Sequence, residues 1–369
     1  MDPRAGNATT DGDEIPTLHL QSAPIAMDLS AEVIHHIVAS TYRPANDGLR
    51  PAPVGPDVWA ALKGIYPTAQ RVFSGARSNE FIKRMRLSLR ALFHLEIWAN
   101  WYEFLETSPF GRIANFYPRI YEKPFRPYLH KDLDSRERCR LLLQHYGFLA
   151  KHAPVGLVDA VLTNQPFLLN EQSLGELEQP LVVNLTYAKH MQQEGELTLS
   201  VGPLASLDSF QQHAWIASLT FIVRPGSAGW EIAVGGVQGG HAETGKEDAK
   251  TATRVFHGLR PKHLLIHVLR EIAACWGIAR IYGISNAAHS LTRKRYQGRI
   301  TIKSSYDELW DEAGGQPDGY GYYLLPLHQA RRAMESIPSR KRAQYQRRYR
   351  LLDAIDAEIR AKLTYRQVP

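Results

Sequence analysis

Four runs of alternating apolar and polar residues follow one another in the middle of the chain, separated by short connections. In sequence order they are LVVNLTYAK (181–189), GELTLSVGPL (195–204), HAWIASLTFIV (213–223) and GWEIAVGGVQG (229–239). A period of two residues is typical of β-strands. Because short connections join antiparallel neighbours, these runs predict a β-meander. The chain must therefore build a largely antiparallel sheet and find helices to cover it.

A helix and then another strand follow the meander. The segment GLRPKHLLIHVLREIAACWG (258–277) has helical periodicity, with Leu264, Val268 and Ile272 on its apolar side. Its other side carries residues that we expect to face solvent: His263, His267, Arg270 and Glu271. The patterns then predict a strand (278–285), a helix (305–313), a strand (319–327) and a final helix from Ser339. These elements indicate an α/β fold with a mixed, largely antiparallel sheet.

The part of the chain before the meander is predicted to be helical. Helices are expected near residues 28–40, 57–63, 79–106 and 135–151, the last one capped by Asp134 and Ser135. Four prolines between residues 108 and 130 exclude a long helix there and predict an ordered loop held by aromatic side chains. We therefore divide the chain into a disordered tail (1–27), a helical region (28–175), a mixed α/β sheet domain (176–335) and a basic C-terminal helix (336–369).

Composition places the chain among ordinary globular proteins. It has 369 residues, of which 44% are hydrophobic, enough for a substantial core. The two cysteines, Cys139 and Cys275, belong to no metal-ligand or redox spacing, which favours a reducing compartment. The first 30 residues lack the pattern of a signal peptide, and the most apolar helix (91–105) is too polar to span a bilayer. We expect a cytoplasmic protein without a transmembrane segment.

The net charge of +7 is concentrated near the C-terminus. Eight cationic residues and one acidic residue lie between residues 331 and 350, so this segment accounts for the whole excess. Most of these cations are expected on the solvent side of the last helix. Arg348 is different, because it falls within the apolar stripe and must snorkel, pair with a carboxylate or meet an anionic ligand. The cluster could contact nucleic acid or anionic lipid through phosphate groups.

The strongest candidate for a site follows the strand at 278–285. Asn286 and His289 stand at its carboxyl end, where ligands collect in sheets of this kind. A cationic cluster with one tyrosine comes next in the sequence: Arg293, Lys294, Arg295, Tyr296 and Arg299. Asn286 could clamp a ligand and His289 could act as a general base, since imidazole titrates near neutral pH. The alternative is structural: Asn286 caps the next turn and His289 is a surface group.

The start of the helix at residue 261 is a second candidate. Helix N-termini offer unpaired N–H donors and a positive dipole end, and here Arg260 and Lys262 flank them. Gly258 would let a ligand approach the backbone closely. A phosphate, carboxylate or pyrophosphate group would suit this position, so we predict a small anionic ligand. A solvated helix start with adjacent basic residues is the alternative.

Other patterns carry less information. VGGVQGG (234–240) marks a bulge or a close backbone approach, but it matches neither dinucleotide-binding nor Walker motifs. The spacing of His263 and His267 lacks the HExxH context, so no metal site is predicted. There is no GxSxG motif and no Cys–His pair of the kind that hydrolases use.

Several motifs, in this order, resemble the VirK/YbjX family of Gram-negative bacteria over roughly residues 75 to 362. They are RPYLHKDLDSRERCRLLLQHY, GLRPKHLLIHVLREIA, GISNAAH, RKRYQGRI, YDELWDEAGG, DGYGYYLLPL and IPSRKRAQYQRRYRLLDAI. The resemblance implies a link to virulence, to the surface display of outer-membrane proteins and to resistance against antimicrobial peptides. The resemblance does not indicate which molecular activity the protein has.

The order of the elements is also similar, at the level of the fold, to GCN5-related N-acetyltransferases. In that fold acyl-CoA binds where the fourth and fifth strands splay apart. By position, Gly258, Arg260 and Lys262 would meet the pyrophosphate, Asn286 the pantetheine arm, and Tyr296 the leaving thiol as a general acid. The usual Q/R-x-x-G-x-G/A loop is absent from this chain.

Two functions follow from these patterns. The first is an acyl-CoA-dependent acyltransferase-like enzyme acting on an envelope component or a polyamine-like acceptor, with His289 or Glu231 as base and with Arg293, Arg295 and Arg348 among the anion-binding cations. The second is a regulatory or adaptor protein without catalysis, whose basic C-terminal helix binds anionic lipid, nucleic acid or an acidic protein.

Overall fold

The computed structural model describes residues 56–75, 78–170, 181–204, 215–240, 245–292 and 305–364. The predicted tail (1–27) and the predicted helix at 28–40 lie outside these residues.

The described part of the chain contains a mixed sheet with the strand order β1-β2-β3-β4-β5-β6-β8-β7. Its strands are β1 (Phe167–Leu168), β2 (Leu181–Tyr187), β3 (Leu197–Pro203), β4 (Ala217–Gly226), β5 (Gly229–Gly239), β6 (Arg280–Ile284), β7 (Gln316–Pro317) and β8 (Tyr322–Leu325). All neighbouring pairs are antiparallel except β5 and β6, which are parallel. The meander is therefore confirmed as β2 to β5.

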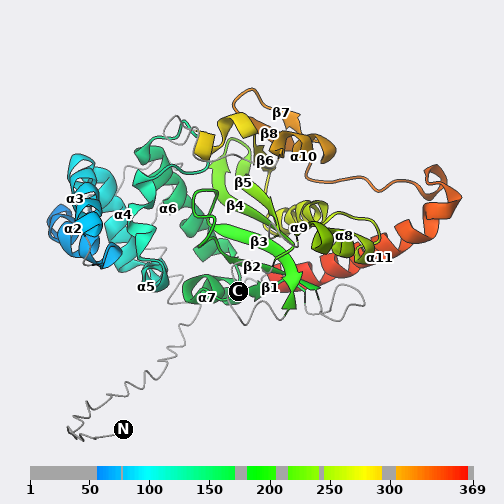
Figure 1. The fold of residues 1–369 in the computed structure, drawn as a ribbon, viewed down its shortest axis with the longest axis horizontal. Coiled ribbons are helices and arrows are strands. Elements are labelled where there is room, and N and C mark those ends of the chain that lie inside the picture. Colours follow the sequence, from blue (N-terminus) through cyan, green and yellow to red (C-terminus); the bar gives the residue numbers. More distant parts are fainter. Residues whose placement is uncertain are drawn as a thin grey trace, which may run out of the picture.

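Helices cover both faces of this sheet. The helices α6 (Ser135–His152) and α7 (Val155–Thr163) contact β4 and β2, while α9 (Pro261–Cys275) contacts β3, β4 and β5 and is itself covered by α11 (Ser339–Leu363). Figure 1 shows the sheet between these two helical layers. Two shorter helices, α8 (Gly245–Val255) and α10 (Tyr306–Glu312), contact α9 and β6, respectively. With cover on both faces, β2 and β3 are buried along almost their whole length, and β4 and β5 are buried except near their ends.

The N-terminal helices extend the molecule away from the sheet. They are α2 (Val58–Val72), α3 (Ser78–Phe93) and α4 (Leu95–Thr107), which occupy one end of Figure 1. The single helix predicted at 79–106 is divided in two, because His94 leaves the helical conformation. Asp134 caps α6 in a reciprocal capping box with Glu137, as expected from its position.

The proline-containing stretch after α4 is ordered and well packed. It forms the 3₁₀ helix η1 (Pro109–Arg112), the short helix α5 (Ile113–Phe116) and the 3₁₀ helix η2 (Pro118–Phe125). Aromatic rings hold it in place, as the sequence predicts: Phe110 lies 4.8 Å from Tyr146 between ring centroids, and the indole of Trp101 donates to the carbonyl of Ile120.

A buried ion pair joins this stretch to the sheet. Nζ of Lys123 in η2 binds Oε1 of Glu196, next to β3, and both side chains are at most 2% exposed. Tyr128 donates to the same carboxylate oxygen at 2.8 Å, and Tyr146 of α6 donates to the other. One hydrophobic cluster accordingly runs from α2 to α11, across the boundary that we predicted at residue 175.

The environment of Arg270 on α9 differs from the one that helical periodicity predicts. We expected its side chain in solvent, but it is 6% exposed and points into the packing between α9 and the segments on either side of β8. Its guanidinium donates to the carbonyls of Pro326 and Ala313 and to the side-chain oxygen of Gln329, at 2.7 to 2.9 Å. Five donors on a planar fork can satisfy several acceptors at once, which helical periodicity alone does not indicate.

Candidate functional site

The two parallel strands separate halfway along their length. Pairing of β5 with β6 runs from Glu231 and Arg280 to Val234 and Gly283, after which β5 continues to Gly239 without β6 beside it. A bulge occurs at the same place, because Thr220 of β4 pairs with Gly236 and Phe221 with Val234, which leaves Gly235 unpaired. The glycine-rich run therefore contains the predicted bulge.

A carboxylate approaches β5 at this bulge. A Cβ atom on Gly235 would lie 2.0 Å from the backbone oxygen of Glu194, and one on Gly236 would lie 1.9 Å from its Oε2 atom. Only glycine leaves room for Glu194 here. The carboxyl group is buried and accepts hydrogen bonds from Nε2 of Gln238 at 3.2 and 3.3 Å.

His289 faces this carboxyl group. Its Nε2 atom lies 3.8 Å from Oε1 of Glu194, and its Nδ1 atom accepts a hydrogen bond from the backbone of Leu291. Burial raises the pKa of Glu194 to about 8, and burial lowers the pKa of His289 to about 4 against a smaller opposing effect of the Gly235 carbonyl. Near neutral pH the pair Glu194–His289 thus holds one proton, which either member could carry.

The first candidate site differs from the sequence-based expectation. His289 is completely buried, so it is neither a surface group nor part of an exposed rim. Asn286 caps α10: its Oδ1 accepts from the backbone of Tyr306, and its own backbone donates to Asp307 at 2.9 Å. The ring of Tyr306 then lies 5.6 Å from that of His289. The predicted residues Arg293, Lys294, Arg295, Tyr296 and Arg299 lie outside the described residues.

The second candidate site contains a cavity of about 780 Å³ at the start of α9. Five cationic residues line it: Lys246, Lys250, Arg254, Arg260 and Lys262. The remaining wall includes apolar residues from four different segments: Ile216, Ala217, Ala249, Pro261 and Leu309. Burial, with a smaller effect of Arg260, lowers the pKa of Lys262. A cavity with cations over an apolar wall suits an elongated anion with an apolar arm.

One helix lies between the cavity and the buried pair. Arg260 forms an ion pair with Glu312 at the end of α10, and Asn286 binds the first residue of the same helix. Seven residues of helix separate these contacts by roughly 9 Å. Leu309 reaches the cavity while Tyr306, one turn earlier, packs on His289. Arg260 and His289 therefore lie near each other, but the described lining of the cavity at α9 includes Arg260 and not His289.

Three other predicted residues have structural partners. Arg348 donates twice to the carbonyl of His257, at 3.1 and 2.8 Å, and its guanidinium lies 4.3 Å from the centre of the Tyr345 ring. This contact fixes the turn at Gly258, which has a φ of +83°.

Glu231 lies 3.6 Å from both Arg224 and Arg280 near the start of β5. It is five residues along the strand from Gly236, or roughly 16 Å.

The two histidines of α9 contact separate carboxylates. His263 lies 3.4 Å from Glu312 of α10, and His267 lies 2.7 Å from Asp356 of α11. In the part of the chain that the structure describes, no group of three or more His, Cys, Asp or Glu side chains is arranged to hold a metal ion. The same residues include no helix with the length and apolar character needed to cross a membrane.

Sequence reasoning missed Glu194. Its signal was indirect: a glutamate in a short connection is usually solvated, and only the glycine run on β5 indicated that something comes close to the backbone.

Comparisons with known proteins agree with the resemblance seen in the motifs. The model of a family described as "Protein of unknown function (DUF535)" matches residues 76–361. The protein YbjX of Escherichia coli K12 is 28% identical over 278 residues, which are 75% of this chain and 82% of that protein. A protein of Haemophilus influenzae is 23% identical over 80% of this chain and 97% of its own length.

A third relative is named "Membrane protein LapB", from Mannheimia haemolytica, and is 23% identical over 61% of this chain and 90% of its own length. No solved structure matches. Because the family model spans most of the chain and YbjX matches in the same region, this protein belongs to the DUF535 family, the VirK/YbjX family of the sequence motifs.

Proposed function

We propose that this protein is an acyltransferase-like enzyme that takes its acyl group from acyl-CoA and transfers it to an envelope component or a polyamine-like acceptor. The observation that carries the proposal is the cation-lined cavity at the start of α9, which is also lined by Gly239 at the end of β5, beyond the point where β5 and β6 separate. Pyrophosphate would meet Arg260, Lys262 and the positive end of the α9 dipole, and the apolar wall would receive the pantetheine arm.

The order of strands supports this proposal. Four antiparallel strands, a helix, a parallel strand that splays from its neighbour and a final hairpin occur in the same order in GCN5-related N-acetyltransferases. In that fold the acyl donor binds between the splayed strands, which correspond here to β5 and β6. Fold order alone does not fix an activity.

We assign the general base to the pair Glu194–His289 rather than to Glu231, whose carboxylate faces two arginines far from the bulge. Only the ionised form of Glu194 can act as a base, and its pKa of about 8 lies near the working pH. In that form Glu194 would take the proton of the attacking nucleophile, while Nε2 of His289 faces its carboxylate. Because both side chains are buried, the acceptor has to enter the space between β5 and β6 for this step. Tyr296 remains the proposed acid for the leaving thiol.

Two observations support the choice of acceptor and compartment. The resemblance to the VirK/YbjX family favours an envelope component, as does the printed name of the Mannheimia haemolytica relative. Both described cysteines are free thiols, which suits a reducing cytoplasm where the acyl donor would be met.

Acyl-CoA is expected to stabilise the wild-type protein against heat. Saturation at about 100 times Kd contributes about 2.7 kcal/mol, which should raise Tm by roughly 3–6 °C. The double change Arg260→Ala, Lys262→Ala should abolish the shift measured with acetyl-CoA and with long-chain acyl-CoA. Arg340→Ala, Arg347→Ala, two exposed cations of α11, is the matched control and should keep the shift. No shift with any acyl donor would remove the enzymatic proposal.

The alternative function without catalysis is supported by α11 itself. Arg340, Lys341, Arg347 and Arg350 are exposed in its first half, which Figure 1 shows projecting beyond α8. Arg348 is unsuitable for a test because it holds His257. Charge reversal by Arg347→Glu, Arg350→Glu is expected to lower the salt concentration at which the protein elutes from heparin. Unchanged elution would speak against binding of polyanions by α11.

A further inference from the structure

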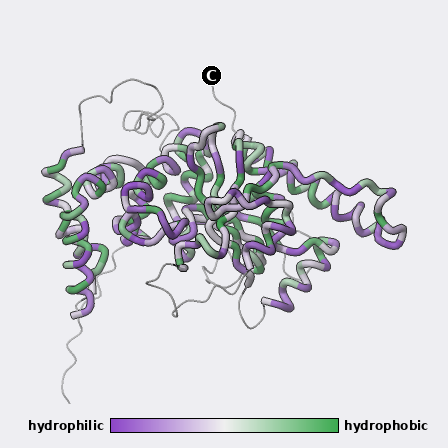
Figure 2. Tube along the Cα trace, turned by 90° about the horizontal axis from the view of Figure 1, so that it is seen from above, coloured by the Kyte–Doolittle hydropathy of each residue, from purple (hydrophilic) through white to green (hydrophobic). Residues whose placement is uncertain are grey.

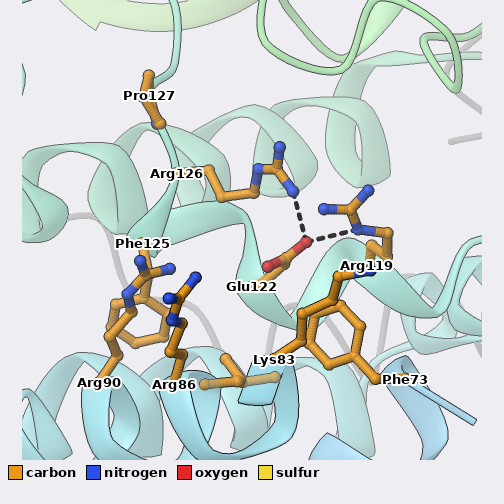
Figure 3. A pocket seen from close by; sticks show the side chains of 10 residues that line it. Phe73, Lys83, Arg86, Arg90, Arg119, Glu122, Phe125, Arg126 and Pro127 are labelled. Atoms are coloured by element: carbon orange, nitrogen blue, oxygen red, sulfur yellow. Dashed lines mark hydrogen bonds and ion pairs between the residues drawn. The ribbon is translucent and has the colours of Figure 1, made fainter. Parts of the chain in front are cut away.

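A second cationic cavity lies in the N-terminal helices, far along the chain from α9. It has a volume of about 170 Å³ and is formed between α3 and η2. Five cationic side chains and one carboxylate line it: Lys83, Arg86, Arg90, Arg119, Arg126 and Glu122. Figure 3 shows Arg86 and Arg90 side by side on α3, on the side of that helix that faces Glu122 and Arg126.

Three of the five cations in this cavity have an ion-pair partner, since Lys83 binds Glu80 at 2.5 Å and Arg119 and Arg126 share Glu122. Glu122 binds both Arg119, at 2.6 Å, and Arg126, at 2.7 Å. Arg86 and Arg90 form no hydrogen bond or ion pair with any residue that the structure describes. Two arginines held one helical turn apart beside a buried, already shared carboxylate leave room for a further anion.

The size of the cavity limits that anion to a small group. A volume of about 170 Å³ corresponds to roughly five or six water molecules at about 30 Å³ each. A phosphate group fits this space, and the rest of a larger ligand would lie outside it. Guanidinium groups bind phosphate oxygens in pairs, so the chemistry favours a phosphate monoester or diester.

An exposed apolar face adjoins the same arginines. Large apolar side chains of α3 are between 40% and 81% exposed: Phe81, Ile82, Met85, Leu89, Leu92 and Phe93. At 100° per residue they occupy an arc of about 120°, while the core-facing Leu87 and Ala91 lie on a separate arc. Arg86 and Arg90 follow directly at one edge of the exposed arc.

This arrangement is unusual for a helix that only covers a core. Soluble proteins rarely expose several large apolar side chains together unless they contact a partner or a membrane. The neighbouring helix α2 adds Trp59, which is 75% exposed. In Figure 2 the end of the molecule formed by α2 and α3 alternates hydrophobic and hydrophilic segments.

We propose that α3 docks on the surface of a bilayer that contains anionic phospholipid. The apolar arc enters the boundary between headgroups and acyl chains, and a lipid phosphate occupies the cavity between Arg86, Arg90 and Arg126. A free phosphate ion would use the cavity but would leave the apolar arc in water, so the lipid explains both features. The docking does not depend on acyl-CoA binding at α9.

Co-sedimentation of the full chain with vesicles tests this proposal. We expect the protein to bind vesicles of phosphatidylcholine that contain about 30% phosphatidylglycerol, an anionic lipid. Binding to vesicles of pure phosphatidylcholine should be weak. The variant Arg86→Gln, Arg90→Gln should bind anionic vesicles roughly 30-fold more weakly. Leu89→Gln, Phe93→Gln should weaken binding by at least as much while keeping every charge.

Controls separate α3 from other basic surfaces. Arg340→Gln, Arg347→Gln on α11 removes the same number of positive charges and should bind like the wild type. Thermal unfolding of each variant shows whether it is folded. Equal binding to both vesicle types, or an equal loss in the α11 variant, would overturn the proposal.

A second experiment with soluble phosphate compounds identifies the source of the phosphate. Inorganic phosphate and glycerol phosphate are added separately, and Tm is measured for the wild type and for Arg86→Gln, Arg90→Gln. Stabilisation that depends on these arginines, together with no binding to anionic vesicles, would indicate a site for free phosphate and would refute membrane docking.

Discussion

Replacing Glu196 by alanine is expected to lower the free energy of unfolding by about 3–5 kcal/mol, measured by urea denaturation. The change leaves the ammonium group of Lys123 buried without its counterion, and it also leaves the hydroxyl groups of Tyr128 and Tyr146 without their acceptor. Burial already lowers the pKa of Lys123, against the opposing effect of Glu196, so the loss of the carboxylate should favour the neutral amine.

Two comparisons identify the cause of this loss. Glu247→Ala breaks an ion pair whose side chains are 65% and 70% exposed, and it should cost no more than about 0.5 kcal/mol. The double change Lys123→Met, Glu196→Leu removes both charges and should recover much of the stability lost by Glu196→Ala. A cost below about 1 kcal/mol for Glu196→Ala would contradict the role of the buried pair.

The stability of the protein is expected to fall by about 2 kcal/mol between pH 6.5 and 8 through the pair Glu194–His289. In the folded protein this pair holds one proton up to the raised pKa of Glu194, about 8. In the unfolded chain the last proton of the two groups leaves near pH 6.5, the ordinary pKa of histidine. The folded state therefore binds more protons in this window, so stability decreases as the pH rises.

The opposite dependence applies at low pH. The pKa of His289 is lowered to about 4, so only between pH 4.5 and about pH 4 does the unfolded chain bind two protons where the folded pair binds one, and stability falls as the pH falls through this narrow window. Between pH 4.5 and 6.5 the pair contributes no slope.

Denaturation of the wild type and of Glu194→Gln at pH 5.5, 6.5 and 8.5 measures this effect, because all other titrating groups are common to both proteins. The variant should lack the decrease above pH 6.5. Parallel curves for the two proteins would show that Glu194 ionises normally.

Local patterns were sufficient for most of the secondary structure. Alternation along residues 181–239 predicted β2 to β5, and the side chain of Asp134 predicted the start of α6. Each of these features depends on residues that are close in the sequence. The bulge on β5 was foreseen for the same reason, since consecutive glycines indicate a close approach.

Features that depend on distant residues were not predictable. The sequence predicts that Arg270 faces solvent, whereas in the structure the segments around β8 provide three acceptors for its guanidinium group. The sequence predicts that His289 lies in an exposed turn, whereas in the structure it is buried beside Glu194, which lies 95 positions earlier in the chain. The cavity at α9 was predicted from Arg260 and Lys262, whereas its other cations come from α8, a helix whose position no spacing reveals.

The contact between Lys123 and Glu196 also governs how the chain can be shortened. A fragment that starts near residue 176 would retain Glu196 and lose the amine that neutralises it, together with the phenols of Tyr128 and Tyr146. A fragment that contains the sheet alone should therefore be unstable. For biochemical work, the helices from α2 onward and the sheet should be expressed as one polypeptide.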